Sequence, residues 1–441
     1  MEKIGKINKF LNNKKGILVL KRIFKYLKPD KRLNFVRYNQ KLQKKLKLNI
    51  DDYEECYEKI EIELEVITDG KNQKNKFINI TNNNHYHIYF NDNKEEIKRN
   101  YMNIYDKVKN IKIIIDYEIN SLSELFKYCS CIKKIKFVKF FRRDINDMSQ
   151  MFEGCSSLEE LNFSNFKTNN VADMNRMFLG CKLIKQLDLS KFATAKVTDM
   201  SQMFALCDSL KELNLSNFDT TNVKNMSYMF QGCSSLKQLN LINFNTYKVN
   251  NMNNMFEECS ELKILNVCSF NTSNVTDMSE MFRNCNSLEE LNISNFNTRK
   301  VNTMRSMFYG CSLLKKLNIS NFNTSNVVSM YCMFYRCSSL RELNISKFNT
   351  NNVNTMYYMF YECSSLKEID LSNFNTNKVT NMDHMFYKCS SIKELDLSSF
   401  NTNKVSTMFG MFEDCKSLKR LKFPNYKGNN KSDKNFTGVM N

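Results

Sequence analysis

Few side chains in this chain have the types and spacing that catalysis or metal binding requires. The three histidines are His85, His87 and His384, and the first two would share one face of a strand because they lie two residues apart. A histidine pair holds a metal ion only together with further ligands, and the sequence places no third ligand beside this pair. We therefore expect two ordinary exposed strand residues and no metal site.

No motif of a common enzyme class is present either. The chain lacks a P-loop, a dinucleotide-binding glycine pattern and a nucleophile elbow. Of the 25 methionines, all but Met1, Met102 and Met440 fall into two columns three residues apart. Methionine at such spacing beside phenylalanine is typical of core packing rather than of a soft-metal site. We expect a protein that is not an enzyme and that binds no cofactor.

The 16 cysteines recur in the same manner. Those from Cys129 to Cys415 include a column spaced by 26 residues, beside phenylalanine and leucine. Clustered cysteines in a short secreted chain indicate disulfides, whereas regular recurrence in an apolar pattern is typical of reduced thiols in a core. Neighbouring units could still bring two thiols within bonding distance, so spacing alone leaves bridges open.

These columns belong to a unit of 26 residues that recurs eleven times without insertion or deletion. In the copy from Phe244 to Phe270, apolar residues follow each other at steps of 3, 3, 1 and 3, which predicts one face of a short helix. The alternating segment after it, from Leu262 to Val267, predicts a short strand. A degenerate copy around Leu122 and Leu125 makes twelve repeats. A strict period of this length predicts a solenoid.

We therefore expect an α/β fold, namely a right-handed leucine-rich-repeat solenoid. Its parallel β-sheet would line the concave face and its short helices the convex face, because helices are about twice as wide as the strand spacing. Asn245 and Thr246 would supply side-chain acceptors for the turn and the start of the helix.

The complete unit, Phe-Asn-Thr-x-x-Val-x-x-Met-x-x-Met-Phe-x-x-Cys-x-x-Leu-x-x-Leu-x-Leu-Ser, closely resembles the BspA-like leucine-rich repeats in their Met-Phe-rich variant. The resemblance covers about residues 119–423. It implies a solenoid used for binding, and members found as bacterial surface proteins act as adhesins. Unlike those members, this chain shows no secretory signal, so we expect a cytoplasmic location.

Composition divides the chain into four parts. Residues 1–50 hold 16 Lys or Arg against two acidic residues, which accounts for most of the net charge of +19, and they predict two basic helices. Residues 51–118 predict a small mixed α+β cap, residues 119–423 the solenoid, and residues 424–441 a polar tail. Within the cap we expect strands at 60–66, 77–81 and 85–90, and the apolar run 111–115 should pair with the first repeat.

Three interpretations of the basic helices remain open. They form a solvated cap, or they bind a membrane surface or nucleic acid, or they contact a ubiquitin-ligase adaptor through residues 17–50. The last rests on Leu20 to Pro29, which resembles the start of an F-box without its leading Leu-Pro. We do not expect nucleic-acid binding, because no stacking pattern supports it. No apolar stretch approaches the ~20 residues of a membrane span.

Binding residues in a solenoid should lie where the columns are interrupted. The outward strand positions form ladders of Glu or Gln, Asn or Asp, and Ser, which would bond from one repeat to the next. Ile242, Ile264 and Cys268 interrupt these ladders and predict a small apolar spot on the concave face.

A larger interruption follows the repeated phenylalanine. That position is tyrosine in four successive repeats, and more aromatic residues lie nearby; the set is Tyr309, Tyr331, Tyr335, Tyr357, Tyr358, Tyr361 and Tyr387, with Phe409. Tyrosine is enriched at protein interfaces, although these rings could also simply pack on one another.

The leading functional hypothesis is a non-enzymatic scaffold that presents a curved repeat surface to a protein partner. Two alternatives are an F-box-like substrate receptor of a ubiquitin ligase and a BspA-like cell-surface adhesin.

Overall fold

The computed structural model describes residues 19, 43–44, 59–67, 74–80, 83–116, 119–140, 142, 144–163 and 166–423. The two predicted basic helices, the F-box-like segment and the polar tail therefore lie outside the described residues, apart from residues 19 and 43–44. In the described part, no helix has the length and hydrophobicity of a membrane span.

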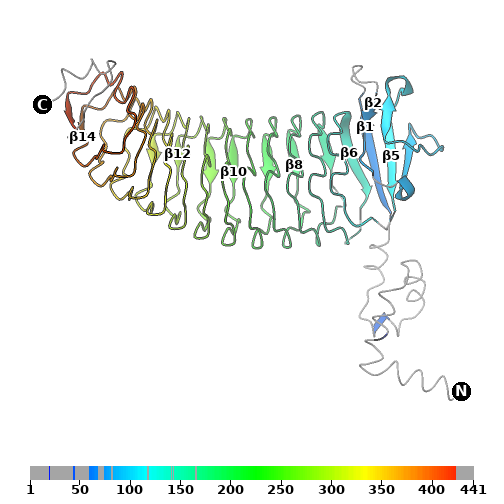
Figure 1. Ribbon diagram of the computed structural model, residues 1–441. Helices are drawn as coiled ribbons and strands as arrows, with labels where there is room; N and C mark the ends of the chain where they lie inside the picture. The colour runs from blue at the N-terminus through cyan, green and yellow to red at the C-terminus, as the bar shows by residue number, and fades with distance from the viewer. Residues whose placement is uncertain are drawn as a thin grey trace.

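The repeats wind into a β-solenoid in which each 26-residue unit makes one turn, here called a rung (Figure 1). All rungs except those at residues 342–344 and 368–370 contribute a short strand to the same face: β6 (Ile132–Lys139), β7 (Glu160–Asn162), β8 (Gln186–Asp188), β9 (Glu212–Asn214), β10 (Gln238–Asn240), β11 (Ile264–Asn266), β12 (Glu290–Leu291), β13 (Lys316–Leu317), β14 (Glu394–Asp396) and β15 (Arg420–Lys422). Paired strands are parallel, and each residue lies opposite the residue 26 positions later, as Leu239 does with Leu265. The predicted solenoid and parallel strands are confirmed.

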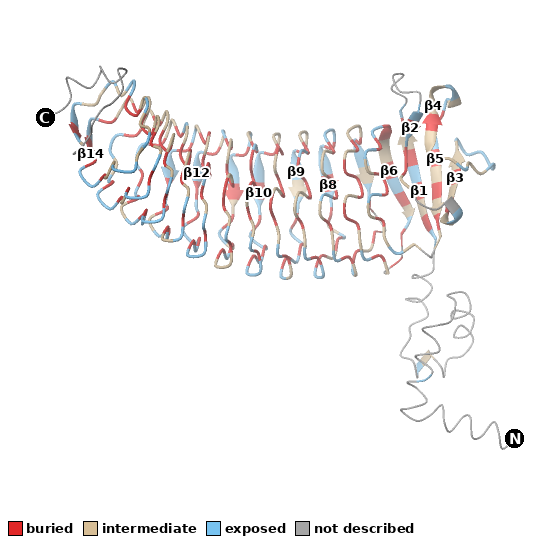
Figure 2. Cartoon of the chain, viewed as in Figure 1, coloured by how far each residue is buried: buried red, intermediate tan, exposed pale blue. Residues whose placement is uncertain are grey.

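A second ladder joins the rungs away from the strands. It consists of eleven successive parallel bridges, which run from Ser121–Asp147 to Asn381–Thr407. Within a rung, buried and exposed residues alternate around the turn, so the same columns line a continuous core from one end to the other (Figure 2).

The predicted convex helices are wrong. Between residues 59 and 423, the described residues contain two short 3₁₀ turns and no α-helix. The segment from Met148 to Cys155, in which the apolar residues follow at steps of 3, 1 and 3, is a chain of tight turns instead. The same spacing points side chains inward in either conformation, and periodicity alone therefore could not separate them.

Hydrogen bonding explains why turns replace a helix. Alternate amides bond inside the rung, as Met151 N–H does to the Met148 carbonyl at 3.3 Å. The amides between them bond to the next rung, as Phe152 N–H does to the Met177 carbonyl at 2.9 Å. A helix would use all its amides internally and would be about 10 Å wide, whereas rungs that share a sheet stack at about 4.8 Å.

Two residues in each chain of turns adopt the left-handed backbone conformation that this alternation needs. In the first full rung they are Gln150 and Gly154, with φ angles of 57° and 70°. Glycine occupies the second column at residues 154, 180, 232 and 310, which was the available sequence signal for a turn instead of a helix.

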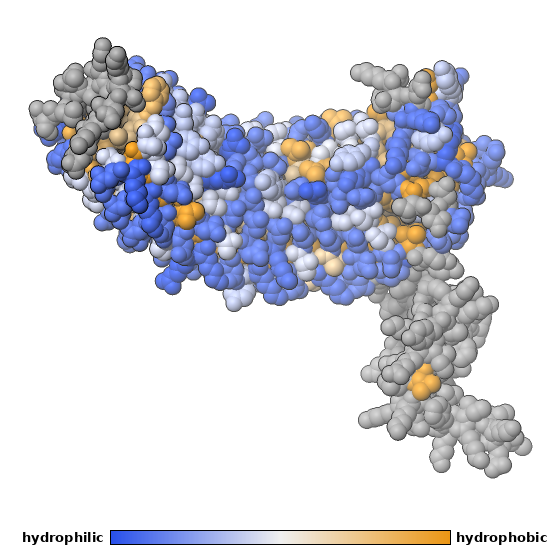
Figure 3. All heavy atoms as spheres, viewed as in Figure 1, coloured by the Kyte–Doolittle hydropathy of each residue, from blue (hydrophilic) through white to orange (hydrophobic). Residues whose placement is uncertain are grey.

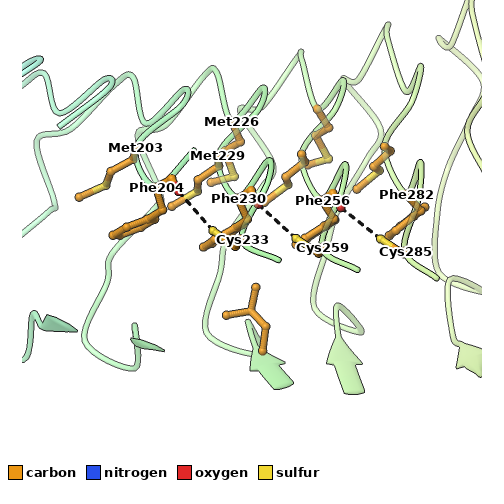
Figure 4. Packing of buried hydrophobic residues seen from close by; sticks show 14 of the residues in the cluster. Met203, Phe204, Met226, Met229, Phe230, Cys233, Phe256, Cys259, Phe282 and Cys285 are labelled. Atoms are coloured by element: carbon orange, nitrogen blue, oxygen red, sulfur yellow. Dashed lines mark hydrogen bonds between the residues drawn. The ribbon is translucent and has the colours of Figure 1, made fainter. Parts of the chain in front are cut away.

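Phenylalanine rings form the centre of the core. From Phe126 to Phe412 they stack rung on rung, and the rings of Phe230 and Phe256, for example, have centroids 5.7 Å apart (Figure 4). From Cys155 to Cys415, each cysteine of the column donates its thiol hydrogen to the phenylalanine carbonyl of the preceding rung, as Cys259 Sγ does to Phe230 O at 3.1 Å. All described cysteines are free thiols, in agreement with the reduced core.

Threonine makes two hydrogen bonds to the neighbouring rung. The Thr246 hydroxyl donates to the carbonyl of Asn271 and accepts from the amide of the same residue, at 2.9 and 2.7 Å. The column repeats this arrangement from Thr168 to Thr376, and the side chains are buried. The predicted role of this threonine at a helix start is therefore wrong, because it bonds the next rung.

The cap ahead of the first rung is a β-structure in its described part. It comprises β1 (Ile60–Val66), β2 (Lys74–Lys76), η1 (Asn83–His85), β3 (Tyr86–Phe90), β4 (Tyr101–Asn103), η2 (Ile104–Asp106) and β5 (Asn110–Ile115). The 60–66 strand is confirmed and the 85–90 strand nearly so, but residues 77–80 form no strand.

The cap and the solenoid share one sheet, in the order β3-β5-β1-β6-β7. β1 lies antiparallel against β6, the strand of the first rung, with Leu64 opposite Ile135. The prediction that residues 111–115 pair with the first repeat is wrong, since β5 pairs with β1 and β3.

Replacing Thr298 by valine keeps the shape of the side chain and removes its two hydrogen bonds to Asn323. The backbone amide and carbonyl of Asn323 lose the buried hydroxyl as their partner, and the free energy of unfolding should fall by about 1–3 kcal/mol in a urea titration. The control is Thr303→Val, at a partly exposed threonine of the same rung. Equal stability of both variants would contradict the threonine ladder.

Alkylation with iodoacetamide at neutral pH should modify Cys268 in the native protein and leave Cys155 to Cys389 of the column unmodified. Cys268 is exposed. Burial raises the pKa of the column thiols, to about 12 for Cys259, so that no reactive thiolate forms. Peptide mass spectrometry before and after unfolding in urea gives the comparison. Modified column cysteines in the native protein, or disulfides between rungs, would refute the assignment.

Candidate functional site

The candidate site is the tyrosine surface, defined as the seven predicted tyrosines with His384 and Phe409. Four of its rings stack in successive rungs, with centroids 4.3 Å apart for Tyr309–Tyr335, 4.5 Å for Tyr335–Tyr361 and 4.6 Å for Tyr361–Tyr387. Their planes lie within 13° of parallel. The tight-turn segments position them, because the same inter-rung amide bonds hold each turn directly over the next.

Two neighbouring columns widen this ladder. Tyr331 and Tyr357 stack at 5.0 Å, and Tyr358 stacks on the His384 imidazole at 4.9 Å. Tyr358 also contacts Tyr361 at a tilted angle and thereby joins the columns. The structure thus brings all seven predicted tyrosines together on one side of rungs 305–413.

Cations lie along the edge of the stack. The Arg283 guanidinium lies 5.1 Å from the Tyr309 ring centroid, and the Lys388 ammonium 5.0 Å from that of Tyr387. Arg336 lies beside Tyr335 and forms an ion pair with Glu362 at 2.7 Å. Burial, aided by neighbouring Tyr309, raises the pKa of Tyr335, which therefore keeps its hydroxyl proton.

A polar network continues the ladder toward the N-terminus. Glu257 is buried, and its carboxylate accepts hydrogen bonds from Arg283 Nη1 at 2.7 Å, Asn254 Nδ2 at 2.7 Å and Gln231 Nε2 at 2.9 Å. Arg283 thus connects the buried carboxylate to the first tyrosine of the stack. These residues occupy the same two columns as Tyr358 and Tyr361, three to five rungs earlier.

The stacking determines what this surface can offer to a ligand. Neighbouring rings and Arg283 cover the faces of the inner tyrosines, so a further aromatic ring or a sugar cannot stack on them. The ring edges and phenolic hydroxyls remain, on half-buried side chains. A row of rigid ring edges and hydroxyl groups is better suited to binding a protein surface than to binding a small molecule.

The apolar spot is a separate feature on the strand face. Ile264 lies in β11 with 63% of its surface exposed, and Ile242 follows β10 with 44% exposed. Cys268 is also exposed. On the face seen in Figure 3, hydrophilic residues dominate the repeats and hydrophobic ones form small scattered groups.

His85 and His87 lie in different elements and have different surroundings. The His87 imidazole lies between two carboxylates, with Nδ1 2.9 Å from Glu96 and Nε2 3.3 Å from Asp116, so the two acids lie on opposite sides of the ring. His85 belongs to η1 rather than to the strand. Among the described residues, no group of three potential ligands could hold a metal ion.

A broad hollow lies over the strand face where the cap meets the first rungs. Its lining includes Glu65, Lys134 and Glu160. Lys134 pairs with both acids, at 3.5 and 3.2 Å. Ion pairs of this kind balance part of the charge that lines the hollow.

Sequence reasoning missed His384 as a part of the tyrosine surface, and Arg283 and Glu257 as the residues that adjoin it. The signal was the repeat itself, since Arg283 lies 26 residues before Tyr309 and His384 lies 26 residues after Tyr358. Residues that lie 26 positions apart are neighbours in space. The residue that precedes or follows a tyrosine in its column is therefore expected to contact that tyrosine.

Replacing Arg283 by leucine should lower the free energy of unfolding by about 2–3 kcal/mol, because the buried Glu257 carboxylate loses its charged donor. Urea unfolding measures the change, and Arg299→Leu, at an exposed arginine, is the control. Adding Glu257→Gln should recover part of the loss by removing the unpaired charge. A loss no larger than that of the control would contradict the proposed network.

Comparison with known proteins gives a family for the repeats. A family model described as "Mycoplasma protein of unknown function, DUF285" matches residues 120–239, 184–290, 207–316, 251–368 and 341–438, which together span more than half of the chain. No curated protein matches the sequence.

Solved structures show distant similarity. One is the crystal structure of a TLR13-ssRNA13 complex, with 16% identity, a TM-score of 0.24, and coverage of 67% of this chain and 54% of that one. Another is a leucine-rich repeat protein from Eubacterium ventriosum, with 15% identity, a TM-score of 0.25, and coverage of 63% and 87%. The chain thus spans about half the length of the first. The family model covers the repeats themselves, and the chain belongs to the DUF285 family.

Proposed function

We propose that this chain is a non-enzymatic scaffold whose tyrosine surface binds a protein partner. One observation carries the proposal. The core columns of the repeats stay the same along the solenoid, while the column after the repeated phenylalanine, which is buried or half-buried up to Tyr387, changes from Glu, Leu, Ala, Gln, Glu and Arg in early rungs to tyrosine in four successive rungs. The phenylalanine core stacks at 5.4–5.8 Å in early and late rungs alike, so packing of the core does not require the tyrosines.

The composition of the surface supports a protein as the partner. Tyrosine and arginine are the residues that most often dominate the energy of protein interfaces, and here rigid tyrosines lie beside Arg283, Arg305 and Arg336. Stacking fixes the side chains before binding, which lowers the entropy cost of association.

We extend the proposal to the type of repeat and to the cellular compartment. The repeat resembles the Met-Phe-rich BspA-like variant, whose solenoids are used for binding. We propose a reducing compartment such as the cytoplasm, because the thiols of the cysteine column act as protonated donors to phenylalanine carbonyls.

The test is the double variant Tyr335→Ser/Tyr361→Ser of the full chain. Affinity capture from extracts of the source cells, with mass spectrometry, should lose the partner that the unaltered chain retains, since the two central rings of the ladder are gone. The matched control is Tyr105→Ser/Tyr247→Ser, at exposed tyrosines outside the surface, with 84% and 58% of their surface exposed.

Circular dichroism and thermal unfolding must show that both double variants remain folded. Retention of the same partner by the folded Tyr335→Ser/Tyr361→Ser variant would refute the tyrosine surface as the binding site. Loss of the partner in both double variants would refute it equally.

A further inference from the structure

One corner of the solenoid carries almost only positive charge. In ten successive rungs, the segment from the end of the strand to the next buried valine and its neighbour (residues 164–172 and the equivalents up to 398–406) contains ten basic residues and one acid, Asp219. The basic residues are Lys167, Lys191, Lys196, Lys224, Lys248, Arg299, Lys300, Lys347, Lys378 and Lys404. We call this corner the basic edge.

The cations of the basic edge are available to a ligand. All of them except the half-buried Lys167 are exposed. None forms an ion pair with another described residue. By contrast, lysines on the strand face, such as Lys134 and Lys136, are paired with the glutamates of the cap. Lys191 lies near Asp188, whose pKa is lowered by hydrogen bonds from Ser190 and, to a smaller degree, by this lysine. The other cations of the basic edge thus have no ion-paired acid among the described residues.

Asparagines hold several of these lysines in place. Lys248 Nζ donates to Asn222 Oδ1 and Lys300 Nζ to Asn274 Oδ1, both at 2.7 Å. The asparagines are themselves fixed, because Asn222 Nδ2 donates to the Ala195 carbonyl and Asn274 Nδ2 to that of Tyr247. Lys196 has the same partner arrangement with Asn170. Asparagine and lysine alternate from residue 170 to residue 300, so the fixed ammonium groups recur at every second rung.

From these observations we propose that the basic edge is a binding site for an acidic polysaccharide, a linear glycan with a carboxylate or sulfate at regular intervals. The fixed lysines lie at least about 10 Å apart, which is two strand spacings. The asparagine, serine and threonine side chains between them supply hydrogen-bonding groups for sugar hydroxyls. This site is independent of the tyrosine surface and of its proposed partner.

Nucleic acid fits the basic edge less well. Phosphates of one DNA strand follow each other at about 3.4 Å along the helix axis, so widely spaced lysines would leave most of them without a cation. Single-stranded nucleic acid also needs aromatic platforms, and Tyr247 is the exposed aromatic residue of these ten segments. Nine of the ten cations are lysines, which act as point charges without the bidentate geometry of arginine.

The test measures binding of the full chain to hyaluronate oligosaccharides, which carry a carboxylate on every second sugar, by calorimetry at low and at physiological salt. We expect binding that weakens as the salt concentration rises. The triple variant Lys196→Gln/Lys248→Gln/Lys300→Gln should bind on the order of tenfold more weakly, since it lacks three charge contacts.

The matched control is Lys185→Gln/Lys211→Gln/Lys237→Gln, which removes the same charge from exposed lysines beside the strand face. It should retain binding within about twofold, whereas general charge attraction would weaken both variants alike. Absence of binding, equal loss in the two variants, or tighter binding of an oligothymidylate at the same lysines would each overturn the proposal. Thermal unfolding of both variants checks that they are folded.

Discussion

The hydrogen bond from one rung to the next is the constraint on which the rest of this structure depends. Amides such as Phe152 N–H do not bond within their own segment but to a carbonyl 25 residues later. This requires every rung to follow the path of its neighbour at about the spacing of strands in a sheet. Hence an insertion in one rung would remove the partners of two others, and the repeats keep a length of 26 residues without exception from Met148 to Met408.

The same constraint explains why the columns in the core keep one residue type, whereas columns nearer the surface vary. A buried side chain contacts its own copies in the rungs before and after, so a ring that stacks well once stacks well throughout, as Phe230 does between Phe204 and Phe256. Cysteine and threonine are kept for a related reason, because each satisfies backbone groups of a neighbouring rung. The columns nearer the surface vary more in residue type, and the tyrosine surface and the basic edge occur there.

Much of the fold and of the tyrosine surface could be predicted from the sequence. The wrong predictions concern hydrogen bonds and strand pairs between residues that are distant in sequence. Period and burial columns follow from residue spacing, and the spacing also placed the seven tyrosines together. It could not decide between a helix and stacked turns, since both turn Met252, Met255 and Phe256 inward. Nor could it assign the hydrogen-bond partners of Thr246 or the order β1-β6 in the cap, because these join residues that are distant in sequence. We expected the solenoid to curve because helices are wider than strands, and this explanation is wrong because the described repeats contain no α-helix. The solenoid bends in its late rungs, in the half that carries the tyrosine surface (Figure 1).

The most direct test of this account is the hydrogen-bond partner of the Phe256 amide, from a crystal structure or from scalar couplings across hydrogen bonds in NMR spectra. The account predicts that this amide donates to the Met281 carbonyl of the next rung, at 2.9 Å. A bond from Phe256 N–H to the Met252 carbonyl, as in an α-helix, would contradict it.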